Sequence, residues 1–191
     1  MIGNLPTGGV RALGKRFGKG FTVVELMVTV AVAGIIAAIA APSFGKMISH
    51  NRLVSSSNEM IAALQVARTE AVTRRAQTTF CPSTDGATCS GGAGSQWIVF
   101  SSRNGVDTQL RSVAANPKMI VKTSANVTGG NGRITFTPAG FVQVGAKSSG
   151  TISVCAADLS GENAVDISAA VVRITSAKRE AGAGCSAPGD I

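Results

Sequence analysis

The longest run of apolar residues lies close to the beginning of the sequence. Between Leu26 and Ala41 the chain has 16 residues, of which only Thr29 is polar. Counted from Phe21 the run has 21 residues, and a helix of that length is about 31 Å long, close to the ~30 Å hydrocarbon core of a bilayer. The pattern therefore predicts a membrane-spanning helix over residues 21–42.

Residues 43–76 have a different pattern, in which apolar positions recur at mostly three- and four-residue spacings. Charged residues lie largely off this stripe, as in an amphipathic helix with one buried face. We expect the helix to continue out of the membrane over residues 43–76 and to pack on a sheet. The apolar stripe consists of Leu53, Met60, Ile61, Leu64, Ala67 and Ala71.

From residue 77 onward the hydrophobic period shifts towards two. Ile134 and Phe136 alternate with polar residues, which is typical of half-buried antiparallel strands. Turn signals separate the runs, and Pro138-Ala139-Gly140 predicts a tight hairpin. The expected fold class is α+β: a long N-terminal helix packed on a β-rich antiparallel head over residues 77–191. The predicted strands are Thr78–Cys81, Trp97–Ser101, Met119–Thr123, Arg133–Thr137, Phe141–Val144, Thr151–Cys155 and Val171–Thr175.

Positive charge is concentrated ahead of the apolar run. The chain has 18 Lys and Arg residues against 10 Asp and Glu, a net charge of +8. Residues 1–20 contain Arg11, Lys15, Arg16 and Lys19 and no acid, and without these four the net charge is +4. Basic residues flank the cytoplasmic end of a membrane helix. We therefore expect residues 1–20 in the cytoplasm and the head across the membrane.

The composition argues against an enzyme. The single histidine, His50, excludes a histidine-based metal site or a Ser-His-Asp triad within one chain, and it is expected on the solvated surface. Two glycine-rich runs, residues 91–94 and 129–132, lack the Lys-Ser/Thr of a phosphate loop. We expect no catalytic residues, no cofactor and no metal.

One carboxylate, Glu25, interrupts the apolar helix near its start. A carboxylate inside a membrane helix is costly and indicates a function by default. The alternative is that Glu25 lies at the headgroup boundary, where the dipole of the helix N-terminus favours a negative charge. An ordinary secretory signal, with a cleavage site at Ala38, Ala40 and Ala41, leaves Glu25 unexplained.

The run GFTVVEL at residues 20–26 resembles the prepilin cleavage site of type IV pilins and type II secretion pseudopilins. The resemblance implies that a membrane prepilin peptidase removes residues 1–20 as a leader by cutting between Gly20 and Phe21. It also implies N-methylation of Phe21 and pairing of Glu25 with the N-terminal amine of a neighbouring subunit. Pro42 matches a proline that bends the helix in this family.

Further along, Asn58–Val72 resembles the FimT/FimU minor pilin and GspH pseudopilin family, as do Trp97–Phe100 and Phe136–Gly140 more loosely. The resemblance implies a pilin-like fold and other pilins as partners. It implies a minor type IV pilin that primes or caps a pilus, first in the bacterial inner membrane with its head in the periplasm, then in the pilus on the cell surface. A type II secretion minor pseudopilin is an alternative.

A second alternative is a pilus-associated receptor for double-stranded DNA. Some FimT-type proteins bind DNA through C-terminal arginines in natural transformation, and Val172–Arg179 occupies the equivalent region by resemblance. The candidate DNA-binding residues are Arg173, Lys178 and Arg179, which depart from the Gly-Arg-x-Arg pattern of those proteins. A solvated surface with scattered charges is the competing interpretation.

Four cysteines in a translocated head indicate disulfides, for which three connectivities are possible. Cys81 and Cys89 are close enough in sequence for a local loop, which favours the pairs Cys81–Cys89 and Cys155–Cys185. The second bond would tie down the C-terminal tail. A zinc site is the rival interpretation, but the sequence contains no C-x₂-C pair.

Overall fold

The structure is a computed structural model that describes residues 20–92 and 94–191. It forms two units, Met1–Ala41 and Pro42–Ile191. Helix α1, Val23–Arg74, has 52 residues and covers all but the outer two residues of each of the two segments that the sequence predicts to be helical. Of the expected leader, residues 1–20, only Gly20 lies within the described residues.

The C-terminal end of α1 is closed by a left-handed residue. Arg75 has φ 50°, its N–H bonds to the carbonyl of Val72 at 3.4 Å, and the N–H of Ala76 bonds to the carbonyl of Ala71 at 3.2 Å. These two bonds form a Schellman cap, which satisfies carbonyls that the helix leaves unpaired. The cap turns the chain directly into the first strand, two residues before the predicted end of the helix at residue 76.

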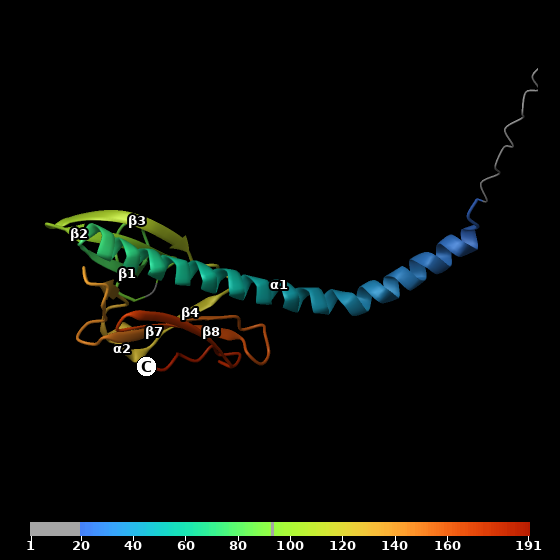
Figure 1. Cartoon of the computed structure of the whole chain (residues 1–191). Coiled ribbons are helices and arrows are strands. Elements are labelled where there is room, and N and C mark those ends of the chain that lie inside the picture. The colour runs from blue at the N-terminus through green and yellow to red at the C-terminus, as the bar shows by residue number, and fades with distance from the viewer. Residues whose placement is uncertain (1–19, 93) are drawn as a thin grey trace, which may run out of the picture. The chain divides into compact units, whose positions relative to one another are not determined.

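Two antiparallel sheets and a short helix, α2 (Ala125–Gly129), complete the head (Figure 1). Sheet A has the strand order β3-β2-β1-β5-β6 and sheet B has the order β4-β7-β8-β9. The α+β architecture with a β-rich antiparallel head is thus confirmed. The strands are β1 Gln77–Ser83, β2 Gln96–Arg103, β3 Val106–Ala114, β4 Ile120–Thr123, β5 Ile134–Phe136, β6 Val142–Gln143, β7 Ser149–Cys155, β8 Ala164–Ala170 and β9 Arg173–Arg179.

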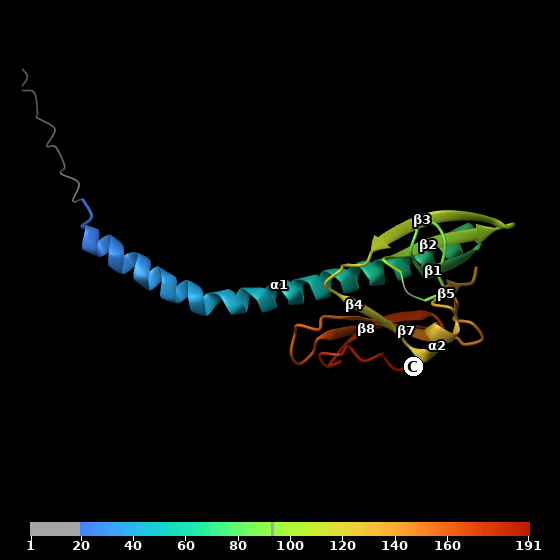
Figure 2. The ribbon, with the colours of Figure 1, turned by 180° about the vertical axis from the view of Figure 1, so that it is seen from behind.

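The core of the head lies where the C-terminal part of α1 packs against both sheets (Figures 1 and 2). Ala63, Ala67 and Ala71 repeat every four residues on α1 and are completely buried. Their small side chains form a ridge that lets the sheets approach the helix closely. On sheet A, Phe80 stacks on Trp97 with 4.9 Å between ring centroids. Sheet B contributes the buried side chains Ile152, Val154, Ile167 and Ala169.

Two strands were not expected from the pattern of apolar residues. β3 is exposed along most of its length, so it shows no apolar alternation, and it joins β2 through a two-residue turn with Asn104 at φ 53° and Gly105 at φ 78°. That geometry is a type I′ turn, the preferred connection of a hairpin. β8 is the second missed strand. The strand predicted from Val171 begins at Arg173 instead, because Val171 has φ 48° and belongs to the turn before β9.

Candidate functional site

The sequence motif GFTVVEL places its residues around the first turn of α1. Gly20, Phe21 and Thr22 precede the helix, which begins at Val23. The Thr22 side-chain oxygen accepts a hydrogen bond from the N–H of Glu25 at 3.2 Å. A threonine followed three residues later by glutamate is the sequence of a capping box, in which both residues satisfy free N–H groups of the first turn. The helix start is therefore set directly after the predicted cleavage site.

The apolar side chains that follow are all exposed. Phe21 is 79% exposed and Ile39 is 74% exposed, and residues 20–39 contain no buried position. Within the described part of the chain, α1 is the one helix long and apolar enough to cross a membrane. So much exposed apolar surface requires lipid or other apolar helices around it.

Glu25 is the one charged residue between Phe21 and Gly45, and it lies in the first turn of this apolar helix. Its carboxylate is exposed and has no ion pair among the described residues. The position of Glu25 in the first turn agrees with the helix-dipole interpretation. Once the helix is inserted into apolar surroundings, the negative charge of Glu25 requires a cation as its partner. The two interpretations are compatible, because one concerns the helix start and the other its partner.

All four cysteines of the chain form disulfides in the head. Cys81 bonds to Cys89 with 5.6 Å between Cα atoms, and Cys155 bonds to Cys185 with 5.9 Å. These are the pairs expected from the sequence, and they leave no thiol for the rival zinc site. The first bond closes a loop beside sheet A, and the second attaches the C-terminal tail to sheet B.

The loop between Cys81 and Cys89 is organised around the carboxylate of Asp85. It accepts hydrogen bonds from the backbone N–H groups of Ala87 and Thr88, both at 2.8 Å, and from the hydroxyls of Thr88 at 2.7 Å and Ser83 at 2.8 Å. The backbone N–H of Thr88 and then that of Ala87 hold the pKa of Asp85 well below its usual range, because they stabilise the charged form.

Replacing Asp85 with asparagine should loosen this loop at neutral pH. Because the pKa of Asp85 is depressed in the folded protein, its contribution is fully present above the unfolded pKa and is lost as pH falls through the folded value. We expect hydrogen exchange at Ala87 and Thr88 to be several-fold faster in D85N than in wild type at pH 7. The difference should narrow only well below pH 4. An equal difference at all pH values would contradict the electrostatic explanation.

Of the three candidate DNA-binding residues, Arg179 is already occupied within the head. Its Nε lies 2.6 Å from the carboxylate of Asp166, and its two terminal nitrogens each bond to Ser186 at 2.9 Å. The guanidinium thereby joins β8, β9 and the C-terminal tail. Its role in the structure is to hold the tail, and a phosphate would have to compete with these contacts.

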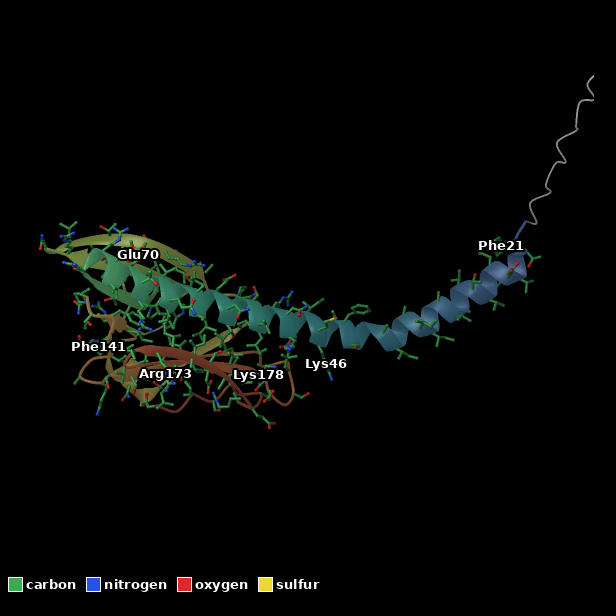
Figure 3. The ribbon with its side chains drawn as sticks, in the orientation of Figure 1. Phe21, Lys46, Glu70, Phe141, Arg173 and Lys178 are labelled. Atoms are coloured by element: carbon green, nitrogen blue, oxygen red, sulfur yellow. A yellow bond between two sulfur atoms is a disulfide. The ribbon has the colours of Figure 1, made fainter. Side chains whose placement is uncertain are left out.

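Arg173 and Lys178 extend from β9 but not from the same face. Successive side chains of a strand point to opposite faces, so Arg173 and Arg179 share one face and Lys178 lies on the other. Lys178 lines a hollow together with α1, and Figure 3 shows Arg173 and Lys178 at the two ends of the red ribbon below that helix. The structure thus separates the three cations that the sequence places together, and DNA binding by them stays a prediction.

Several residues that hold the tail were not singled out from the sequence. Asn163 is completely buried, accepts a hydrogen bond from the N–H of Ala181 at 2.8 Å and donates to the carbonyl of Gly182 at 2.9 Å. At the end of the chain, Ser149 donates to the carbonyl of Ile191 at 2.5 Å. A lone asparagine in a polar segment carries no sequence signal that distinguishes it from a surface residue.

Comparison with known families decides the affiliation of the chain. A family model described as "Type II transport protein GspH" matches residues 56–172, more than half of the chain. The chain belongs to the GspH family. A second model, "Prokaryotic N-terminal methylation motif", matches residues 15–41 and so covers Gly20, Phe21 and Glu25. A search of curated proteins finds no match.

Solved structures show that this GspH-family chain has a pilin fold. The crystal structure of the type IV minor pilin FimU from Pseudomonas aeruginosa strain PAO1 in space group P21 matches with a TM-score of 0.50 at 22% sequence identity. The match covers 66% of this chain and 88% of FimU. FimU in space group P65 gives the same TM-score and identity, over 65% of this chain and 92% of FimU.

Membership of the GspH family confirms the affiliation expected from the sequence. Pilins and pseudopilins are structural proteins rather than enzymes, and they interact with other pilins and undergo prepilin processing. The apolar start of α1 is accordingly a membrane anchor that precedes assembly into a fibre.

Proposed function

We propose that this GspH-family chain is a minor type IV pilin that is cut between Gly20 and Phe21, methylated at Phe21 and assembled into a pilus that it primes or caps. One observation carries the proposal. Glu25 is the single charge between Phe21 and Gly45, the exposed apolar part of α1, and it lies in the first turn, within the motif GFTVVEL.

Cleavage supplies a partner for Glu25. It turns Phe21 into the first residue, and the new amine keeps its positive charge when methylated. Four residues of helix rise about 6 Å, so the amine of one subunit reaches the layer of its neighbour's Glu25 when the two helices are shifted axially by about one turn. A buried carboxylate is tolerated when it meets a cation in the same layer of low dielectric constant. The pair would therefore set the axial register of subunits.

The charges and the disulfides support the same orientation in the membrane. Arg11, Lys15, Arg16 and Lys19 precede the apolar segment, and basic residues remain on the cytoplasmic side. Disulfides form in an oxidising compartment, and the two in the head support a periplasmic location for it. After assembly the head would lie on the pilus at the cell surface.

Processing can be tested by the N-terminus of the protein. Mass spectrometry of the protein isolated from its native cells should find a chain that begins with methylated Phe21. The variant Gly20→Val should keep its leader, because it removes the glycine of the cleavage motif next to the cut. Gly34→Ala, a change inside the apolar helix, should be processed like the wild type. A wild-type chain that still begins at Met1 would refute the proposal.

A second candidate function is a minor pseudopilin of type II secretion. The observation that favours it is the family model itself, which is described as a type II transport protein. Deleting the gene and counting surface pili and secreted proteins separately distinguishes the two. Loss of pili with normal secretion supports the minor pilin, and the reverse supports the pseudopilin.

A further inference from the structure

A groove runs along one side of the head between α1 and β9. It consists of two hollows, of 490 Å³ and 310 Å³, which follow one another along the helix. All of the residues that line them belong to the unit Pro42–Ile191. The larger hollow is lined by Gln65, Arg68, Thr69, Val72, Thr73 and Ile174, and the smaller by Val54, Ser57, Asn58, Ile61, Val165, Ser176, Ala177 and Lys178.

One edge of the groove is a strand with an unpaired side. β9 is the last strand of sheet B and pairs only with β8. Within residues 20–92 and 94–191, no group hydrogen-bonds to the other edge of β9. A free edge presents a row of N–H and C=O groups that an extended chain can pair with, and natural proteins usually cover it. The length of β9, seven residues, gives an edge of about 23 Å.

The walls of the groove combine partly exposed apolar side chains with positive charge. Val54 is 39% exposed and Val72 is 49% exposed, while Ile61 and Ile174 are half-buried. One cation lines each hollow, Arg68 in the larger and Lys178 in the smaller, whereas neither lining includes an acid.

Neither cation has an ion pair in the described part of the chain, where the salt bridges are Arg74–Glu70 and Arg179–Asp166. Ile174 and Lys178 are four residues apart on one face of β9, about 13 Å along the strand. Because Ile174 lines the same hollow as Arg68, an extended segment along β9 passes Arg68 at one hollow and Lys178 at the other.

We propose that this groove binds an extended acidic segment of a partner protein, which pairs with the free edge of β9 and adds a fifth strand to sheet B. Main-chain hydrogen bonds to β9 supply affinity, as in other cases of strand addition. Apolar side chains of the segment contact the exposed flank of α1. Its carboxylates pair with Arg68 and Lys178, and this charge complementarity selects an acidic partner.

A peptide strand fits the groove better than a nucleic acid does. Duplex DNA needs many cations aligned along its backbone, and this groove has two. The apolar floor and the unpaired strand edge have no counterpart in a phosphate backbone. Binding to the head does not require assembly into a fibre, so the proposal can fail while the proposed pilin function holds, and the reverse.

A designed peptide tests the groove on the full-length mature protein in detergent. The probe is VTDTVTDTV with both ends capped, which presents two aspartates four residues apart on one face. We expect it to bind and to protect amides of residues 173–179 from hydrogen exchange. The variants R68E and K178E should each weaken binding about tenfold, whereas R103E, an equal change of charge at the end of β2, should have no effect.

Modified peptides test main-chain pairing and charge recognition separately. The peptide is also prepared in two N-methylated forms, one methylated at the odd-numbered residues and one at the even-numbered residues. One of the two forms should lose binding, because its methyl groups block main-chain pairing with β9. The peptide with lysine in place of aspartate should not bind. If a charge reversal alters the circular dichroism spectrum, R68Q and K178Q replace it.

Three results would overturn the proposal. One is no binding of the acidic peptide at 1 mM. Another is binding that both N-methylated forms retain unchanged. The third is protection of β9 by a 20-base-pair DNA duplex in place of the peptide, with the same loss in R68E and K178E.

Discussion

Replacing Glu25 with alanine should lower the amount of this protein in sheared fibres about a hundredfold, relative to its amount in the membrane. The proposed pair joins the Glu25 carboxylate to the amine of Phe21 in a neighbouring subunit. Its loss leaves the amine charged and unpaired in an apolar layer, a penalty of about 3 kcal/mol or more. Quantitative mass spectrometry of sheared fibres and membranes measures the ratio.

Two controls are needed to interpret the result for E25A. E25A should still be cut between Gly20 and Phe21, since both residues at the cut are unchanged. Glu59→Ala changes an exposed acid on the head portion of α1 and should leave incorporation at the wild-type level. Normal incorporation of processed E25A would show that Glu25 serves only the start of the helix, where it already donates its N–H to Thr22.

Removing the bond between Cys155 and Cys185 should lower the stability of the head more than removing the other disulfide does. The two cysteines are 30 residues apart, and opening a loop of that length lowers the free energy of unfolding by about 3–4 kcal/mol in the chain-entropy model. Trp97 is 3% exposed and is the single tryptophan, so its fluorescence during urea unfolding reports on the core. The variant to measure is C155S/C185S.

The other disulfide provides the matched comparison. Cys81 and Cys89 are only eight residues apart, so C81S/C89S should lose less, about 2–3 kcal/mol. An equal or larger loss in C81S/C89S would contradict loop length as the cause. If C155S/C185S keeps wild-type stability, Arg179 and Asn163 hold the tail without the covalent bond.

The helical part of the fold could be predicted because its signals are local. Five of the six stripe residues of the amphipathic segment are buried, and the sixth, Ile61, is half-buried. The strands were harder. β8 contains several alanines, and β3 buries little on either side, so neither shows a clear apolar period. The Asn104-Gly105 turn was the available signal for β3, because such a turn joins two paired strands.

The candidate site likewise combines features that the sequence shows with features that depend on the folded structure. The cleavage motif, the single carboxylate and the apolar helix are properties of one run of about twenty residues, so they can be read in order along the chain. The roles of the charged residues in the head cannot be read in this way, because each role depends on the residue with which the charge pairs in the folded protein. Arg173, Lys178 and Arg179 look alike in sequence, yet strand alternation and the Asp166 carboxylate give them different surroundings.

The amino-acid order alone thus specified the proposed processing site, the membrane anchor, the amphipathic helix and the family resemblance, since each depends on residues that are neighbours in the chain. Tertiary structure decided the strand order, the attachment of the tail and the groove beside β9. These arise from contacts between distant segments, such as Arg68 on α1 and Ile174 on β9, which line one hollow although they are far apart in sequence. Which strand ends a sheet, and what covers its edge, is a result of packing that no local period encodes.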